Sequence, residues 1–198
     1  KQASPRVRIV GYTASPFNGA GVWLHMLPEH RIFTGTVAEI GIGELLRDGY
    51  LCPLTPYQAN TRLDTSGVAI DARTGDFAVG QLQAAVDVPE LVLQCASEIK
   101  SIFAERDSVL VFCAGVEHAH HVAAALGSSA KVVTGKTPKG EREQIISEYS
   151  SGALKYLVSV DILTTGFDSP RTSGIANLRP SRSPLIWLQL TGRGLRLH

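Results

Sequence analysis

Short apolar runs alternate with amphipathic segments in the second half of the sequence. Four of these runs have the length and composition of buried strands: VLVFC (109–113), KVV (131–133), KYLVSV (155–160) and SGIANL (173–178). Helical spacing of apolar residues follows the first two runs, at 115–126 and 140–152, and a last helix is expected from about Pro184 to Leu190. This alternation predicts an α/β fold with a doubly wound parallel sheet covered by helices on both faces.

The first half of the chain is less regular. RVRIVGY, at 6–12, is predicted to be a strand, and residues 39–51 a helix that stops at Gly49. Turn residues mixed with short apolar pieces at 53–79 indicate a connector. Residues 89–106 have apolar positions three and four apart, which predicts an amphipathic helix leading into the sheet.

The carboxyl ends of parallel strands meet at one edge of a sheet, and ligands bind there in open α/β folds. The segments that follow Cys113, Val133, Val160 and Leu178 are therefore expected along a single functional edge.

The most specific local signal is QLTGRGLR, which runs from Gln189 to Arg196 with the form QxxGRxxR. Arg193 and Arg196 are expected on one helical turn, where two rigid guanidinium forks suit a polyphosphate, and Gly192 would permit close approach. The alternative is a solvated basic helix end, which the helix dipole favours.

Two weaker signals are LTTGFD, from Leu163 to Asp168, and TASPF, from Thr13 to Phe17. Hydroxyl groups and a glycine-supported backbone can hold a phosphate, and a carboxylate can hold a ribose hydroxyl or an arginine. Ordinary turns with hydroxyl and Asx capping explain the same residues.

Taken together and in this order, with VLVFCAGVEHA between them, the three segments resemble motifs III, IV, V and VI of superfamily 2 helicases. The strings GYTASPF, GELLRDGYL, VVTGKTPKGER, LVSVDILTTGFDSP and QLTGRGLRL look most like the RadD group of bacterial DNA-repair helicases, which is related to type III restriction translocases. The resemblance implies a RecA-like C-terminal lobe at 89–198, a connector or accessory segment at 21–88, and at 1–20 the end of the preceding lobe with its strand.

The resemblance also implies roles at the nucleotide. Arg196 resembles the arginine finger that reaches the γ-phosphate, Arg193 a second phosphate or coupling contact, and Gln189 a residue that orders this turn. Gly166 and Asp168 would sense the nucleotide across the cleft. ATP and Mg²⁺ would be bound mainly by the missing N-terminal RecA-like lobe, a partner within the same polypeptide.

For nucleic acid, the resemblance implies contacts to the sugar-phosphate backbone, which carry no sequence information. DNA is the expected partner, with RNA left open. The positions concerned are Thr134, Gly135, Thr164 and Thr165 for the backbone grip, and Thr13 and Ser15 for the link between ATP and strand binding.

Several local sequence features do not indicate the function that they suggest at first sight. TGKT, at 134–137, is no Walker A motif because the pattern needs glycine where the chain has Ala130. Without a Walker A or DExx element in the sequence, the chain is expected not to hydrolyse ATP alone. His118, His120 and His121, with Glu117, are assigned to an exposed helix face and not to a metal site. Cys113 is assigned to the core, and single tryptophans to core or interface positions.

The overall composition and charge add little to this prediction. An apolar fraction of 44% and three well-separated cysteines predict a globular protein of a reducing, cytoplasmic setting, without a disulfide framework or membrane span. The net charge of +1 mildly disfavours a self-sufficient DNA-binding domain. A free-standing nucleotide- or protein-binding module and the motor subunit of a restriction enzyme stay open as alternatives.

Overall fold

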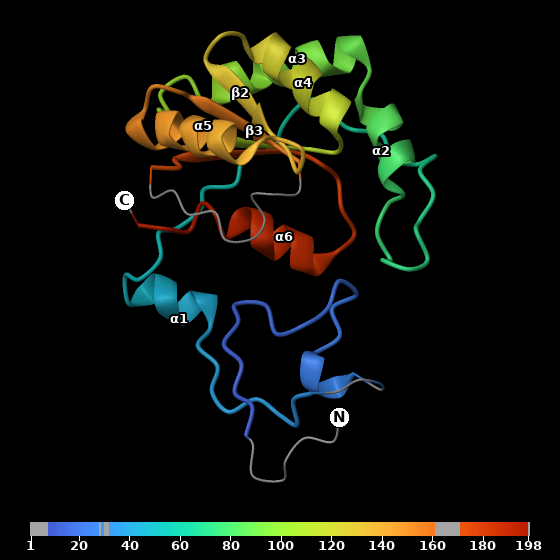
Figure 1. Ribbon diagram of the computed structural model, residues 1–198, viewed down its shortest axis with the longest axis vertical. Coiled ribbons are helices and arrows are strands. Elements are labelled where there is room, and N and C mark those ends of the chain that lie inside the picture. Colours follow the sequence, from blue (N-terminus) through green and yellow to red (C-terminus); the bar gives the residue numbers. More distant parts are fainter. Residues whose placement is uncertain (1–7, 28, 30–31, 161–170, 198) are drawn as a thin grey trace.

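The computed structural model describes residues 8–27, 29, 32–160 and 171–197 (Figure 1). Its regular elements, in chain order, are η1 (Leu24–Met26), α1 (Ile42–Arg47), α2 (Val79–Val86), α3 (Pro89–Ile102), β1 (Val109–Cys113), α4 (Val116–Leu126), β2 (Ala130–Val133), α5 (Lys139–Ser151), β3 (Tyr156–Ser159), β4 (Gly174–Leu178) and α6 (Pro184–Thr191).

The four strands form one parallel sheet in the order β2-β3-β1-β4. Each of the four predicted strands is present, with ends that differ from the prediction by at most two residues. The central strand β1 is buried along its whole length, as expected for a parallel sheet covered on both faces. The predicted α/β fold class with a doubly wound sheet is confirmed.

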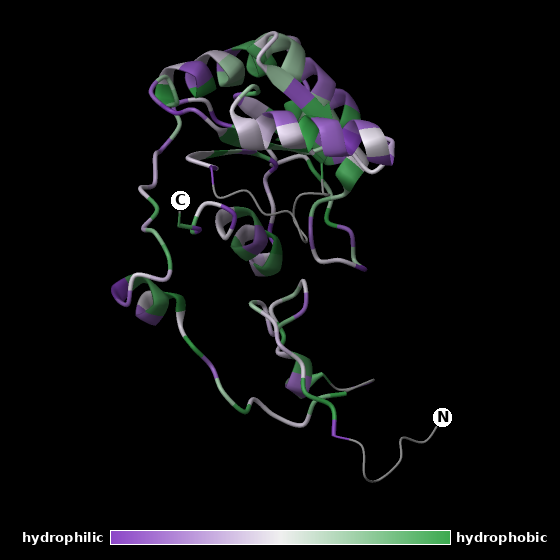
Figure 2. Cartoon of the chain, turned by 60° about the vertical axis from the view of Figure 1, so that its left-hand side comes forward, coloured by the Kyte–Doolittle hydropathy of each residue, from purple (hydrophilic) through white to green (hydrophobic). Residues whose placement is uncertain are grey.

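Side chains of β1 alternate between two cores because successive residues of a strand point to opposite faces. Val109, Val111 and Cys113 pack with α3 and α4, whereas Leu110 and Phe112 pack with α5 and α6. Figure 2 shows helices on both sides of the sheet, with the hydrophobic strands between them. The two helix layers therefore fix the sheet between them.

Glycines end two of the predicted helices. Gly152 follows α5 in the left-handed region at φ 86°, and Gly49 follows α1 at φ 75°. Glycine adopts this conformation without a Cβ penalty. The stop predicted at Gly49 is confirmed, as is the end of α5 at Gly152.

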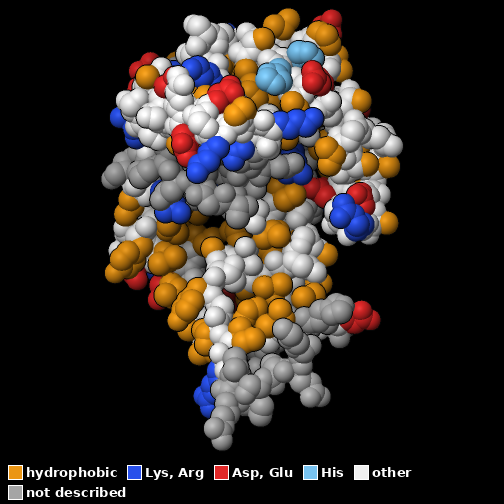
Figure 3. Space-filling model, in the orientation of Figure 1, with side chains coloured by type: hydrophobic (Ala, Val, Ile, Leu, Met, Phe, Trp, Pro, Cys, Tyr) orange, Lys and Arg blue, Asp and Glu red, His pale blue; other side chains and the backbone are white. Residues whose placement is uncertain are grey.

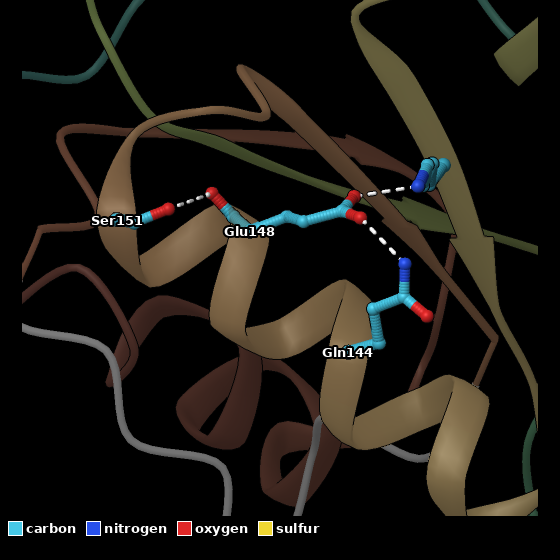
Figure 4. A network of polar contacts seen from close by, with 4 residues as sticks. Gln144, Glu148 and Ser151 are labelled. Carbon is cyan, nitrogen blue, oxygen red and sulfur yellow. Dashed lines mark hydrogen bonds and ion pairs between the residues drawn. The ribbon is translucent and has the colours of Figure 1, made fainter.

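A polar network joins α5 to β2 (Figure 4). Lys131 Nζ lies 2.5 Å from one carboxylate oxygen of Glu148, and Gln144 donates to the other at 3.0 Å. Ser151 donates to the Glu148 carbonyl at 3.0 Å. The Lys131 hydrogen bond is the main reason that the pKa of Glu148 lies below its usual value. The network matters because α5 buries only Ile145 and Tyr149.

Helix α2 lies inside the predicted connector and was not anticipated from the sequence. Leu82 and Val86, four residues apart, form a small third core with Val68 and Ala114. Its eight residues are too short to give a clear periodic signal among the surrounding turns.

The strand predicted at RVRIVGY is not present in the described residues. Residues 8–12, its described part, form no strand. A strand needs hydrogen bonds to a neighbouring strand, and among the described residues none pairs with this segment. The adjoining N-terminal part is thinly packed, since Tyr12 and Val37 are each 96% exposed. Figure 3 shows hydrophobic side chains gathered on this part of the molecule.

No helix among the described residues has both the length and the apolar character required to cross a bilayer.

Candidate functional site

The carboxyl ends of the strands meet at one edge, as the sequence predicted. Val133 of β2 pairs with Ser159 of β3, Phe112 of β1 pairs with the same Ser159, and Cys113 pairs with Leu178 of β4. Residues 134–137, named here the threonine loop, leave this edge after β2. Residue 179 leaves it after β4. The segments after β2 and β4 therefore leave the sheet at the same edge, which is where ligands bind in open α/β folds.

The threonine loop is closed by its own side chains. The Thr134 amide donates to Thr137 Oγ1 at 2.9 Å, and the Lys136 amide donates to Thr134 Oγ1 at 3.2 Å. Thr134 is buried, whereas Gly135 and Lys136 are exposed. The Thr134 hydroxyl thus shapes the loop from within, and the exposed surface of the loop is the backbone and side chains of residues 135 and 136.

Arg142 supports the threonine loop from α5. Its guanidinium Nη2 donates to the Thr137 carbonyl at 3.0 Å and lies 3.5 Å from the Thr134 carbonyl. A charged donor makes such bonds stronger than neutral ones. The loop is therefore held at both ends to the first turns of the following helix.

The predicted helical placement of the two arginines is wrong. Helix α6 ends at Thr191, and the chain continues through turns in which the Arg193 amide donates to Leu190 and the Gly194 amide to Thr191. Glycines at 192 and 194 explain the early end because glycine is a poor helix former. We name residues 192–197 the arginine turn. Within it Arg193 is half-buried and Arg196 is exposed, while Gln189 is half-buried on α6 itself.

Glycines allow the arginine turn to pack closely. A Cβ on Gly194 would lie 2.9 Å from Ile175 Cδ1 of β4 and 3.0 Å from Leu54 Cδ2, and a Cβ on Gly192 would lie 2.8 Å from the Leu188 carbonyl. The close approach expected at Gly192 is thus to the backbone of α6. The turn lies directly against the sheet and the segment around residue 54.

The segment around residue 52 also holds the arginine turn. The Cys52 amide donates to the Leu195 carbonyl at 2.9 Å. Its thiol lies 3.1 Å from the Gly194 carbonyl and 3.2 Å from the Arg196 carbonyl. Cys52 was not predicted as a site residue, because its partners are 142 and 144 residues away and leave no local pattern.

Thr13 and Ser15 form a compact hydroxyl-capped turn. The Ser15 amide donates to Thr13 Oγ1 at 3.1 Å, and that hydroxyl donates to the Ser15 carbonyl at 3.3 Å. Beyond it, Asn18 Oδ1 accepts the amides of residues 20 and 22, and the Gly19 carbonyl accepts a 2.8 Å hydrogen bond from Ser183 Oγ. Ser183 is the residue before α6, so this N-terminal segment is joined to the helix that carries the arginine turn.

The other nucleotide and nucleic-acid positions expected from the sequence, Gly166, Asp168, Thr164 and Thr165, lie outside the described residues.

His118 departs from its assignment to an exposed helix face. It is 2% exposed, and its Nδ1 accepts the Ala114 amide at 3.3 Å, so it ties the start of α4 to the end of β1. Burial lowers its pKa, while Asp87 acts in the opposite direction. His120 and His121 are exposed as expected, and Cys113 is buried as expected. Among the described residues, no three His, Cys, Asp or Glu side chains gather as metal ligands.

The fold and the site define a doubly wound α/β domain in which the threonine loop emerges at the carboxyl edge of a parallel sheet and the arginine turn follows the last helix. Residues 93–198 match the family model described as helicase conserved C-terminal domain, and the chain belongs to this family. The resemblance to superfamily 2 helicases is thereby confirmed, while the narrower likeness to the RadD group stays a prediction.

Two fungal relatives match nearly the whole chain. It is 26% identical over 201 residues to a Saccharomyces cerevisiae protein named as an ATP-dependent helicase, IRC3, covering 99% of the chain and 28% of that protein. It is 30% identical over 202 residues to a Schizosaccharomyces pombe protein named as a mitochondrial ATP-dependent helicase, irc3, covering 98% of the chain and 31% of that protein. The chain spans about a third of the length of these relatives.

Bacterial proteins match shorter stretches. The type I restriction enzyme EcoKI endonuclease subunit of Escherichia coli is 29% identical over 139 residues, covering 62% of the chain and 12% of that subunit. Among solved structures, the E. coli DEAD-box protein SrmB is 25% identical with a TM-score of 0.48, over 55% of the chain and 65% of that chain.

Proposed function

We propose that this chain is the C-terminal half of an ATP-dependent DNA helicase or translocase that acts in DNA repair. It supplies an arginine finger from the arginine turn and a backbone grip from the threonine loop. The observation that carries the proposal is membership of the helicase C-terminal family, together with the position of the threonine loop directly after β2 at the carboxyl edge of the sheet. Relatives named as ATP-dependent helicases support it.

Residues of the arginine turn fit a nucleotide polyphosphate. Arg196 is exposed, and a guanidinium offers a rigid fork of donors to phosphate oxygens. Arg196 would contact the γ-phosphate and Arg193 a second phosphate, while Gln189 on α6 orders the turn. ATP supplies the phosphoryl group whose hydrolysis drives the motor; the chain's own part is to stabilise negative charge on the phosphate with Arg196. Mg²⁺ and the remaining phosphate contacts belong to the N-terminal RecA-like lobe, to which residues 1–20 belong, with 21–88 as connector.

Exposed apolar side chains support the need for that lobe. Ile9, Val10 and Tyr12 in the segment before Thr13 are 56%, 65% and 96% exposed. Contact with a neighbouring lobe would bury these side chains, and exposed apolar patches of this kind mark interaction sites. Thr13 and Ser15 then lie where ATP binding and strand binding are coupled.

The threonine loop presents its exposed backbone to nucleic acid. Gly135 and Lys136 face solvent, whereas Thr134 holds the loop shape from within. Backbone amides and a lysine contact phosphates without reading bases. Thr164, Thr165, Gly166 and Asp168 complete the grip and the nucleotide sensor in this proposal.

The test is ATP hydrolysis by the full-length gene product, with and without single-stranded DNA, duplex DNA and RNA, beside the isolated 198-residue chain. We expect strand-stimulated turnover in the long protein and none in the isolated chain. Arg196→Ala should lower stimulated turnover about 10³-fold and leave ATP binding intact, since the finger acts on the transition state. Arg171→Ala, an exposed arginine before the amino end of β4, is the matched control. Unchanged turnover in Arg196→Ala would contradict the assignment.

A second candidate is the motor subunit of a restriction enzyme, which the likeness to the EcoKI subunit favours. The same assay separates the two if a nuclease activity is measured beside it. Cleavage of duplex DNA that depends on ATP and on a methylation-sensitive site would replace the repair proposal.

A further inference from the structure

Two contacts from residues 21–88 hold the two ends of α6. At the amino end, Asp76 is 7% exposed and both of its carboxylate oxygens are used. Oδ2 accepts Ser181 Oγ at 2.8 Å, and Oδ1 accepts the Arg182 amide at 2.7 Å. At the carboxyl end, Cys52 binds three successive carbonyls of the arginine turn through its amide and thiol.

Asp76 orders the segment that enters α6. Ser181 Oγ, held by Asp76, also accepts the Ser183 amide at 3.0 Å, and the Ser181 carbonyl accepts the indole N–H of Trp187 at 2.9 Å. Ser183 in turn donates to Gly19. One buried carboxylate therefore fixes the residues on which the first turn of α6 is built.

Packing alone leaves α6 weakly located. Leu190 is its buried residue, Ile186 is partly buried against the same core, and Trp187 is 46% exposed. Because α6 buries few side chains, the contacts at its ends contribute to the position of the arginine turn.

We propose that Asp76 and Cys52 are positioning residues for the arginine turn: by holding the two ends of α6, they set where Arg196 meets the phosphate. This inference rests on the proposed function. It assigns a role to residues 21–88, which the sequence left open.

The test uses matched pairs in the full-length protein. Asp76→Ala and Cys52→Ala remove the side-chain contacts. Asp76→Asn keeps an acceptor for the Arg182 amide and a polar partner for Ser181, and Cys52→Ser keeps a hydrogen-bond donor. We expect each alanine variant to lower the strand-stimulated kcat about tenfold with the KM for ATP within about twofold, because misplacement affects the transition state more than binding. The Asn and Ser variants should restore kcat.

A double-mutant cycle separates positioning from folding. If Asp76 acts through Arg196, adding Asp76→Ala to Arg196→Ala should cause no further loss of kcat, since the group it positions is already absent. An equal loss in both backgrounds, or failure of Asp76→Asn to restore kcat while the Tm recovers, would overturn the inference. If Asp76→Ala does not fold, the Cys52 pair decides by the same comparison.

Failure of this inference is distinct from failure of the proposed function. Full activity in Asp76→Ala and Cys52→Ala beside an inactive Arg196→Ala would overturn the positioning roles alone. Full activity in Arg196→Ala would remove the arginine finger itself.

Discussion

Arg142 Nη2 on α5 lies 3.0 Å from the carbonyl oxygen of Thr137, so the helix that follows the threonine loop donates back into it. Among the described residues, Arg142 is the charged side chain that donates hydrogen bonds to the threonine loop. The Thr134 and Thr137 hydroxyls accept amides of the loop, and the Thr134 carbonyl accepts the Thr137 amide at 3.1 Å. Arg142 adds donors to the Thr134 and Thr137 carbonyls. Arg142 therefore supports the shape of the threonine loop from outside, beside the hydroxyl contacts that close it from within.

Replacing Arg142 with alanine should weaken nucleic-acid binding by the full-length protein about tenfold, because a charged hydrogen bond contributes roughly 1.5–3 kcal/mol to the ordered loop. The loss should be the same for single strands of different base sequence, since backbone contacts carry no sequence information. Fluorescence anisotropy with two labelled oligonucleotides measures it. Lys139→Ala, which removes an 89% exposed charge from the first turn of the same helix, is the control. Equal losses in the two variants would mean that only charge matters.

Gly194→Ala should destabilise the protein by about 1–3 kcal/mol, as expected when a methyl group is forced into a packed site. The added Cβ would lie 2.9 Å from Ile175 Cδ1 and 3.0 Å from Leu54 Cδ2. Urea unfolding measures the change. Gly140→Ala is the matched control because nothing lies within 4 Å of its Cβ position and alanine favours a helix, by up to about 1 kcal/mol. An unchanged midpoint for Gly194→Ala would show that the neighbours move aside freely.

His121 should make stability depend on pH near neutrality. Its hydrogen bond to Asp87, with Nδ1 and Oδ1 2.8 Å apart, raises the pKa of His121 above the usual 6.5. The folded state holds this proton more tightly than the unfolded state does. The stabilisation of the folded state by the His121–Asp87 pair is therefore complete below pH 6.5 and is lost as the pH rises through the raised pKa. Unfolding midpoints of wild type and His121→Ala should therefore differ at about pH 6 and converge towards pH 8. His120→Ala, on the same exposed side of α4, controls for the loss of an imidazole; a constant difference across this range would contradict the prediction.

Glu98 should also make stability depend on pH, but its contribution to stability is lost as the pH falls. Its carboxylate accepts the amides of Asn60 at 2.6 Å and Thr61 at 3.0 Å, and these bonds, Asn60 first, hold the pKa of Glu98 below 4.5. The stabilisation is present above 4.5 and is lost as pH falls through the lowered pKa. Glu98→Gln should unfold at lower urea than wild type at neutral pH, because one amide then meets a side-chain donor. The difference in urea midpoint between wild type and Glu98→Gln should disappear in acid. The control is Glu105→Gln, at an exposed position, which should leave the midpoint unchanged at every pH.

Local patterns carried most of the prediction of the sheet and its helices. VLVFC, KYLVSV and SGIANL are apolar runs bounded by turn residues, and such runs form strands wherever both faces are covered. Pro89 and Gly152 mark helix ends by conformational restriction within a few residues. The parallel order then brings the loops after β1, β2 and β4 to one edge, a consequence of topology that the alternation of elements already implies.

The sequence identified the residues of the arginine turn, but the helical conformation predicted for its two arginines is wrong. QxxGRxxR was visible as a motif, yet its two glycines end α6 at Thr191, and close packing of Gly194 against Ile175 and Leu54 decides the path beyond. The short helix α2 and the burial of His118 were likewise invisible, because each depends on a neighbour far away in the sequence.

The sequence by itself determined the α/β class, the position of each strand within two residues, and the motifs that identify the helicase C-terminal family, because all of these are encoded by nearby residues. Only the tertiary structure decided which residues hold those motifs in place. Cys52 meets the arginine turn across 142 residues and Asp76 meets Ser181 across 105, and contacts over such separations form only when the chain has folded.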